Sequence, residues 1–454
     1  MGGVRNIVNE VVDIRDKEAE LKSLVGAILH EAEHQGASAA EVSVTQDTGL
    51  SVTVRKGELE TVEFNQDRGF GITVYFGQSK GSASTSDSSH AAIQETVSKA
   101  SDIARYTQDD PCNGLADSNL MPTVLPELDL FHPVDLDTKM ATELAEACEA
   151  EGLNYDKRVV NSDGAQASTQ QSCRVYGNSH GFIGSSLATR HGISCMLIAE
   201  DDNGMQTDYW YTVNRDFDAL EAPEAVGRIA AERAVARLSP QKVATGSFPV
   251  LFSAQMTTGL VGHLLGAISG GALYRKSSFL LDSLGTRVLS DHVTLIEEPL
   301  LPKRIGSAGF DGEGVATWEK SFVDRGVVEH YVLSSYSGRK LGMATTGNAG
   351  GVHNLTLSGN TQAFDDLLKT LGTGLYVTEL MGQGVNGVTG DYSRGASGFW
   401  VEDGEIRYPV SEITIASNLK RMFQDIVAVG DDVDERSNVR TPSLLIGAMT
   451  LAGS

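Results

Sequence analysis

Cysteine is scarce in this chain, which has four cysteines among 454 residues. They are widely spaced and include no C-x-x-C pair: Cys112, Cys148, Cys173 and Cys195. A disulfide framework or a zinc knuckle needs cysteines that are clustered more closely, so the sequence favours neither. Reduced thiols in a cytoplasmic protein are the prediction.

Long apolar runs and an excess of positive charge are also absent. No apolar stretch approaches the roughly 18 residues of a membrane-spanning helix, and residues 1–20 lack the apolar segment of a secretory signal. Asp and Glu outnumber Lys and Arg by 60 to 36, which gives a net charge of −24. An acidic surface of this kind repels phosphate backbones and anionic lipid. We therefore expect no nucleic-acid partner and no membrane partner.

Glycine is abundant, with 49 residues, but the glycine-rich segments lack the context of a phosphate-binding loop. Neither "SGGALYRKSSF" nor "GNAGGVHN" lies between a strand and a helix as G-x-G-x-x-G requires, and no P-loop sequence occurs. Strand bends and turns are the favoured interpretation of these glycines.

Hydrophobic periodicity predicts two mixed units in the first half of the chain. In residues 1–110, helical spacing at 17–36 and 88–105 flanks strands in which valines such as Val42 and Val44 recur at period two. Residues 111–244 begin with a linker rich in Asp, Pro and Asn. A second α/β unit follows in that part, with helices predicted at 138–151 and 224–238.

Residues 245–454 differ from the first half of the chain, because the pattern there predicts short strands separated by many turns. Asp324-Arg325-Gly326 and Asp403-Gly404 each separate two alternating runs, as hairpins require. One helix is predicted near the start, at 256–269. The fold class that follows is α+β: a mixed α/β N-terminal region with antiparallel sheets, followed by a β-rich barrel-like or sandwich-like C-terminal domain.

The segment "HEAEH" at residues 30–34 matches the H-E-x-x-H signature of zinc peptidases, in which two histidines bind zinc one helical turn apart. However, the apolar stripe from Leu21 to Ala32 turns His30 and His34 to the opposite, solvated face of the helix. Zinc ligands need a sheltered cleft and supporting hydrogen bonds. Two surface histidines are the favoured interpretation. The alternative hypothesis is that zinc at His30 and His34 makes the chain itself a peptidase.

Longer strings in the C-terminal half carry a resemblance to a known family. "GHLLGAISGGALYRKSSFLLDSLG", "SSYSGRKLGMATTGNAGGVHN" and "LLIGAMTLAG" resemble the PmbA/TldE branch of the TldD/PmbA metalloproteases, and "QGASAAEVSV" is similar to the first domain of that family. The resemblance implies a subunit of a heterodimeric zinc metalloprotease that acts on short or unfolded peptides in the cytosol. A TldD-like paralogue would be the partner.

The resemblance also implies where the catalytic zinc lies. In the TldD-like branch an H-E-x-x-x-H helix holds the metal, and its three motif positions fall on Gly262, His263 and Ala267 here. Glycine and alanine offer zinc no lone pair, and residues 431–449 contain no cysteine for the remaining ligand. We therefore expect no catalytic residue and no metal on this chain, with the zinc on the partner subunit.

From the residues alone, the helix around His263 predicts a packing role. Its apolar side includes Leu260 and Leu264, and its glycines at 259, 262 and 266 predict close approach by neighbouring backbone. A structural role is favoured for His263, and a contribution to the partner's active site or to a shared cavity is the alternative.

Arg394 and His353 are the candidates for substrate contact. Arg394 lies in "TGDYSRGASGF", which the resemblance places close to the cleft, and its planar guanidinium suits a peptide carboxylate. A structural role is an equal alternative. No spacing argument assembles His353 into a catalytic set. A non-enzymatic, homo-oligomeric peptide-binding or regulatory protein is the alternative function, and a homodimer is an expected form of the isolated chain.

Overall fold

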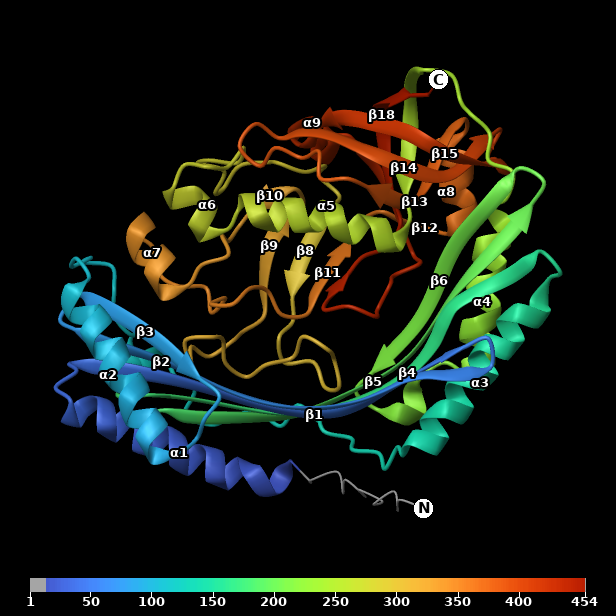
Figure 1. Cartoon of the computed structure of the whole chain (residues 1–454). Coiled ribbons are helices and arrows are strands. Elements are labelled where there is room, and N and C mark those ends of the chain that lie inside the picture. Colours follow the sequence, from blue (N-terminus) through green and yellow to red (C-terminus); the bar gives the residue numbers. More distant parts are fainter. Residues whose placement is uncertain (1–13, 454) are drawn as a thin grey trace, which may run out of the picture.

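The computed structural model of the protein describes residues 14–453. The prediction that residues 1–20 lack the apolar segment of a secretory signal falls partly on residues 1–13, which lie outside the described residues. Within residues 14–453, no helix is both long and apolar enough to cross a bilayer. A strongly curved N-terminal sheet forms a cradle, and the C-terminal domain lies on its concave side (Figure 1).

The N-terminal sheet has six antiparallel strands in the order β3-β2-β1-β4-β5-β6. The strand bounds are β1 (Ala39–Arg55), β2 (Glu58–Phe76), β3 (Ser79–Thr85), β4 (Val159–Asn178), β5 (Ile183–Asp201) and β6 (Gly204–Asn214). Val42, Val44 and Val52 of β1 are all buried on one face, which confirms the period-two interpretation. β1 pairs with β4, so the sheet contains strands from both sides of residue 110. The domain boundary predicted at that residue stays a prediction.

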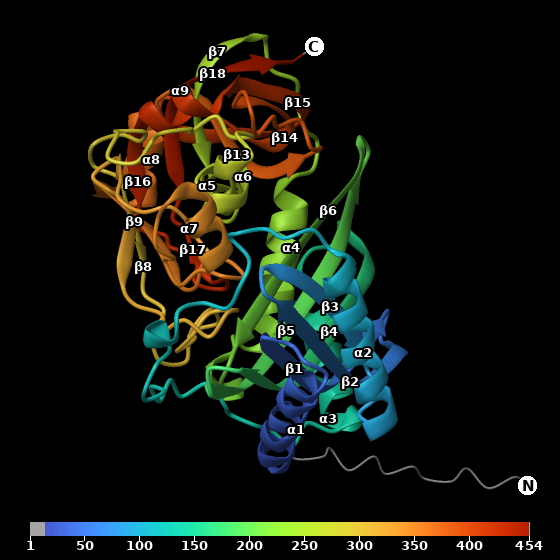
Figure 2. The same cartoon turned by 90° about the vertical axis from the view of Figure 1, so that its left-hand side faces the viewer.

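Two pairs of helices cover the convex face of this sheet (Figure 1 and Figure 2). Their bounds are α1 (Arg15–His34), α2 (His90–Tyr106), α3 (Thr138–Tyr155) and α4 (Pro223–Ala236). The first pair shares a core with one half of the sheet and the second pair with the other half. Side chains of Ser89 and Asp137 cap the N-termini of α2 and α3. The predicted helices in this region are confirmed to within a few residues.

The C-terminal domain contains a closed five-stranded barrel, which confirms the predicted barrel-like architecture. Its strands are β7 (Gly246–Phe252), β13 (Gly374–Met381), β14 (Asp391–Glu402), β15 (Glu405–Asn418) and β18 (Leu444–Ala452). The pairing of β18 with β7 closes the ring. Two further strands extend the sheet beyond β18, namely β16 (Ile426–Gly430) and β12 (Thr361–Gln362).

A second, five-stranded sheet completes the domain in the order β10-β9-β8-β11-β17. Its strands are β8 (Thr294–Glu297), β9 (Lys320–Asp324), β10 (Val327–Val328), β11 (Leu355–Ser358) and β17 (Val439–Arg440). The helices of the domain are α5 (Ala254–Ala267), α6 (Gly270–Tyr274), α7 (Ser335–Leu341), α8 (Phe364–Leu371) and α9 (Leu419–Gln424). Both predicted hairpins are present, and Arg325 and Asp403 adopt the positive φ angles that such tight turns need.

Polar contacts fix the C-terminal domain on the N-terminal half. Arg339 of α7 donates to the carbonyl oxygens of Cys112, Gly114 and Leu115 in the linker. At the far end of the sheet, the Arg436 guanidinium lies 3.8 Å from the centre of the Trp210 ring. Since these contacts hold both ends of the cradle, the middle of the concave face lies between two anchored regions.

Candidate functional site

Helix α5 carries the three positions that the resemblance aligns with a zinc motif. Its buried side, which includes Leu260 and Leu264, packs into the main core of the C-terminal domain. A helix that buries only one stripe leaves its other side to solvent or to a ligand. The exposed side of α5 therefore decides which chemistry the helix supports.

The glycines of α5 lie on this exposed side, and the expectation that they allow close backbone packing is wrong. A Cβ atom added at Gly259, Gly262 or Gly266 would meet no atom within 4 Å. The spacing of the three glycines predicts that they pack against the rest of the protein. The apolar residues between them, which include Leu260 and Leu264, make this packing contact instead. The glycine side of α5 faces open space.

His263 and Arg394, two of the predicted site residues, meet around Tyr392. The imidazole of His263 packs edge-on against the Tyr392 ring, with a centroid distance of 6.1 Å and an interplanar angle of 79°. Tyr392 is buried, and burial raises the pKa of its hydroxyl to about 12 despite the opposing charge of Arg394. The Nε atom of Arg394 is buried without a hydrogen-bond partner.

The same cluster controls the charge of His263. Burial disfavours the imidazolium, and the nearby Arg394 charge adds to that effect, so the pKa of His263 lies below 6.5. The imidazole is therefore neutral at neutral pH. A neutral ring that is packed edge-on against an aromatic ring fits the structural role favoured from the sequence.

We expect the Arg394→Gln substitution to raise the pKa of His263 toward its ordinary value, because one of the two causes of the depression is removed. NMR titration of the His263 ring protons measures this shift. Arg407→Gln, at an arginine of β15 paired with Glu405, is the control and should leave the pKa unchanged. Equal titration curves for the wild type and the Arg394 variant would contradict the electrostatic coupling.

The donor set on α5 does not fit a zinc ion. Gly262 and Ala267 carry no ligand atom, which leaves the single imidazole of His263, and three or four donors are the rule for zinc in proteins. Over residues 14–453, no group of three or more His, Cys, Asp and Glu side chains is arranged to hold a metal. The aligned positions of this chain therefore provide no zinc site.

The alternative zinc motif lies on α1. His30 and His34 are both exposed, while Leu21, Val25 and Ile28 on the opposite face are buried. The side chain of His30 is 82% exposed, and its ion pair within residues 14–453 is with Glu33, at 3.9 Å. This exposure agrees with the helical-wheel argument, which placed His30 and His34 on the solvated face and away from any sheltered metal site.

His353 lies in a different environment from Arg394. It is largely buried, and both its backbone amide and its ring nitrogen Nδ1 contact Oε1 of Glu297, at 2.6 and 3.2 Å. Lys320 pairs with the other carboxylate oxygen. Within the described residues, no hydrogen bond joins His353 to Arg394. The geometry of His353 is that of a core hydrogen-bond network.

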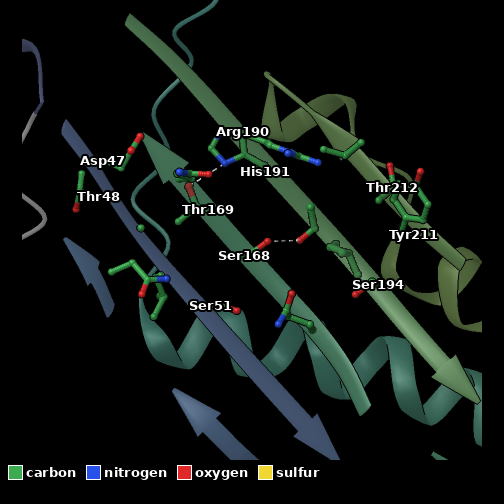
Figure 3. A pocket seen from close by; sticks show the side chains of 18 of the residues that line it. Asp47, Thr48, Ser51, Ser168, Thr169, Arg190, His191, Ser194, Tyr211 and Thr212 are labelled. Atoms are coloured by element: carbon green, nitrogen blue, oxygen red, sulfur yellow. Dashed lines mark hydrogen bonds between the residues drawn. The ribbon is translucent and has the colours of Figure 1, made fainter. Parts of the chain in front are cut away.

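Sequence reasoning missed a polar cavity of about 440 Å³ on the concave face of the N-terminal sheet. Figure 3 shows Asp47 on β1 and Arg190 on β5, with Ser168 on the intervening β4. The sequence of β1 contains a signal for this cavity, because the residues that alternate with its buried residues are polar or glycine. Only the strand order, which periodicity does not give, brings these polar residues together across five strands.

Comparisons with known proteins agree with this architecture throughout the chain. Models of the PmbA/TldA metallopeptidase family match domain 1 at residues 40–104, the central domain at 131–238 and the C-terminal domain at 245–453. The chain belongs to the PmbA/TldD metalloprotease family. The resemblance predicted from the C-terminal strings is confirmed.

Individual members of the family are similar over nearly their whole length. The chain is 51% identical to the metalloprotease PmbA of Escherichia coli O157:H7, covering 91% of this chain and 92% of that protein. It is 48% identical to a PmbA homologue of Haemophilus influenzae, covering 98% and 99%. A crystal structure from Bacteroides thetaiotaomicron, of a protein named as a candidate modulator of DNA gyrase, matches with a TM-score of 0.91 and 28% identity, covering 96% of this chain and 100% of that one.

Proposed function

We propose that this chain is the metal-free subunit of a heterodimeric zinc metalloprotease that acts on short or unfolded peptides. The proposal rests on the contrast between the metalloprotease family of the chain and the lack of metal-binding atoms on its helix α5. The chain aligns from end to end with proteins named as metalloproteases, yet Gly262 and Ala267 on α5 have no atom that binds zinc. A catalytic zinc would then sit on a TldD-like paralogue.

The proposed role of this subunit is to complete an enclosed cavity that admits peptides and excludes folded proteins. The curved sheet, with the C-terminal domain in contact with it at both of its ends, supports this role because it forms one continuous wall. When bound to the partner, zinc supplies activation of water. His263, neutral and packed against Tyr392, supplies no proton transfer in this scheme. The cytoplasm is the proposed location, a choice supported by four unpaired cysteines.

Metal analysis of the chain purified alone and with a TldD-like partner tests the proposal. We expect little zinc in the isolated chain and about one zinc per pair in the mixed complex, because the donors are on the partner. His263→Ala and the double variant His30→Ala/His34→Ala should leave the zinc content and peptide cleavage of the complex unchanged.

Two outcomes would overturn the proposal. The first is stoichiometric zinc in the isolated chain that is lost in the His263 variant or in the His30 and His34 double variant. The second is a co-expressed pair that never elutes as a mixed complex in size analysis. That result would support the homo-oligomeric peptide-binding or regulatory protein instead.

A further inference from the structure

Two pairs of like charges lie on the concave face of the N-terminal sheet. Asp47 of β1 and Asp67 of β2 are directly opposite each other in the ladder. Arg190 of β5 and Arg215, just beyond β6, continue the register of the pair His191 and Asn214 and are also opposite each other. Like charges directly opposite each other on one face destabilise a sheet. Both pairs therefore cost stability unless a ligand of opposite charge neutralises them.

Neither pair is neutralised inside the protein. In residues 14–453, the carboxylates of Asp47 and Asp67 and the guanidinium of Arg190 make no ion pair and no hydrogen bond. Arg215 donates only to the backbone oxygens of Thr189 and Ile305, at 2.9 and 2.6 Å. Its Nε atom is buried without a partner. The cavity lining thus holds two carboxylates without a cation at one end and Arg190 without an anion at the other, and Arg215 lies beside Arg190.

The electrostatics of Arg215 point to a missing anion. Burial, together with the positive charge of Arg190, lowers the pKa of Arg215 to about 10. A buried guanidinium normally has a carboxylate beside it. A carboxylate bound at Arg190, next to Arg215, would offset the repulsion between the two guanidinium groups.

The strand order sets the distance between the two charged ends. β4 separates β1 from β5, and the partner of Asp47 on β4 is Ser172, while the partner of Arg190 is Gln170. Two strand spacings and a shift of two residues place Asp47 and Arg190 about 12 Å apart. An extended peptide spans about 3.5 Å per residue. A peptide of roughly three to five residues therefore reaches from one end to the other.

Between the two ends the cavity is lined mainly by polar side chains and glycine, while Val213 and Tyr211 of β6 add an apolar and an aromatic side chain. Ser51, Ser168 and Gln170 line it, with Gly49 and Gly192 beside them. Hydroxyl and amide groups can both donate and accept hydrogen bonds, so they match the backbone of a peptide whatever its side chains are. Glycines let a ligand approach the sheet closely. The polar part of this lining suits recognition of the length and the termini of a peptide.

We propose that this cavity binds a short peptide by both of its free ends, with the amino group on Asp47 and Asp67 and the carboxylate on Arg190, next to Arg215. The inference deepens the proposed function, because it takes from it only the class of ligand. The cavity belongs to this chain alone, so it binds peptide without zinc and without a partner. It gives the metal-free subunit a role in holding short substrates or products.

Isothermal titration of the full-length isolated chain with Ala-Ala-Ala-Ala tests this site. We expect the unblocked tetrapeptide to bind, and N-acetylation or C-amidation to weaken binding about tenfold each, because each removes one charged contact. Alanine peptides of two to six residues should show the tightest binding at three to five. No binding at any length, or equal binding of free and blocked peptides, would overturn the proposal.

Two variants assign the ends. Arg190→Gln should weaken the free tetrapeptide about tenfold, yet leave the affinity of the C-amidated peptide unchanged, because that contact is already lost. Asp47→Asn should behave in the same way toward the N-acetylated peptide. Asp47→Asn should also raise the melting temperature, since it removes a like-charge repulsion. Arg407→Gln is the control for a change in net charge. Loss of affinity that is equal for free and blocked peptides would contradict the assignment.

The outcome is separable from that of the proposed function. Peptide binding is measured on the isolated chain, whereas the zinc proposal is tested on the mixed complex. Absence of binding with zinc found on the partner would overturn the cavity proposal alone. Binding with zinc found on this chain would overturn the metal-free assignment alone.

Discussion

Lys320→Met is expected to lower the free energy of unfolding by about 3–5 kcal/mol, because it removes one partner of a fully buried ion pair. The side chains of Lys320 and Glu297 are 1% and 0% exposed. After the substitution, the carboxylate of Glu297 would stay buried with only Asn348 and His353 as polar partners. Urea unfolding, followed by tryptophan fluorescence, measures the loss.

The matched control is Lys369→Met on α8. Lys369 pairs with Asp366 at 2.8 Å, but the two side chains are 70% and 60% exposed. An exposed pair of this kind contributes little to stability, because water and salt screen its charges. Similar losses for Lys320→Met and Lys369→Met would show that burial does not govern the cost. The double variant Lys320→Met/Glu297→Met should recover part of the stability, because no buried charge remains.

The effect of Lys320→Met should also depend on pH. Burial opposes the ionisation of Glu297, but the hydrogen bond from His353 and the charge of Lys320 outweigh burial and hold the pKa of Glu297 below 4.5. A carboxyl with a depressed native pKa stabilises the fold above its unfolded-state pKa and loses that stabilisation as pH falls. The difference between the wild type and the variant should therefore be full at neutral pH and shrink in acid, as pH falls through the native pKa.

The residues of this buried network show why sequence reasoning reached the fold before the sites. Periodicity predicted the helices, the strands and the hairpins, because each depends on residues close together in the chain. Glu297, Lys320 and His353 come from three separate segments, and no spacing rule joins them. His353 was a candidate for substrate contact that no spacing argument placed in a catalytic set, and its burial depends on which strands meet in space.

Glycine gave the least reliable predictions for the same reason. Gly259, Gly262 and Gly266 on α5 have the spacing of a packing helix, yet they face open space. Gly227 on α4 sits in an ordinary alanine-rich helix sequence and is in tight contact with α3. The sequence determines where the chain bends freely, but the position of a neighbouring helix determines whether a methyl group fits.

Gly227→Ala is expected to destabilise the protein by about 3 kcal/mol, at the upper end of the cost of overpacking. A Cβ atom at this position would lie 1.9 Å from the carbonyl oxygen of Cys148 on α3. That atom belongs to the backbone and cannot rotate away, so α3 and α4 must separate. Thermal and urea unfolding measure the loss.

Gly26→Ala on α1 is the matched control, and it should have the opposite sign. A Cβ atom at Gly26 would meet nothing within 4 Å. Alanine is a better helix former than glycine by about 1 kcal/mol, so this variant should gain up to that amount. Destabilisation by both substitutions would contradict the close-packing argument, because helix propensity alone favours alanine at both sites.

The Gly227→Ala substitution also connects the helical layer to the proposed peptide cavity. Helix α4 packs against β5 and β6, and these strands place Arg190 and Arg215 opposite each other on the other face of the sheet. A shift of α4 should disturb the spacing of the two guanidinium groups and therefore weaken binding of the unblocked tetrapeptide more than binding of its C-amidated form. Gly26→Ala, on the helix pair that covers the other half of the sheet, should leave both affinities unchanged.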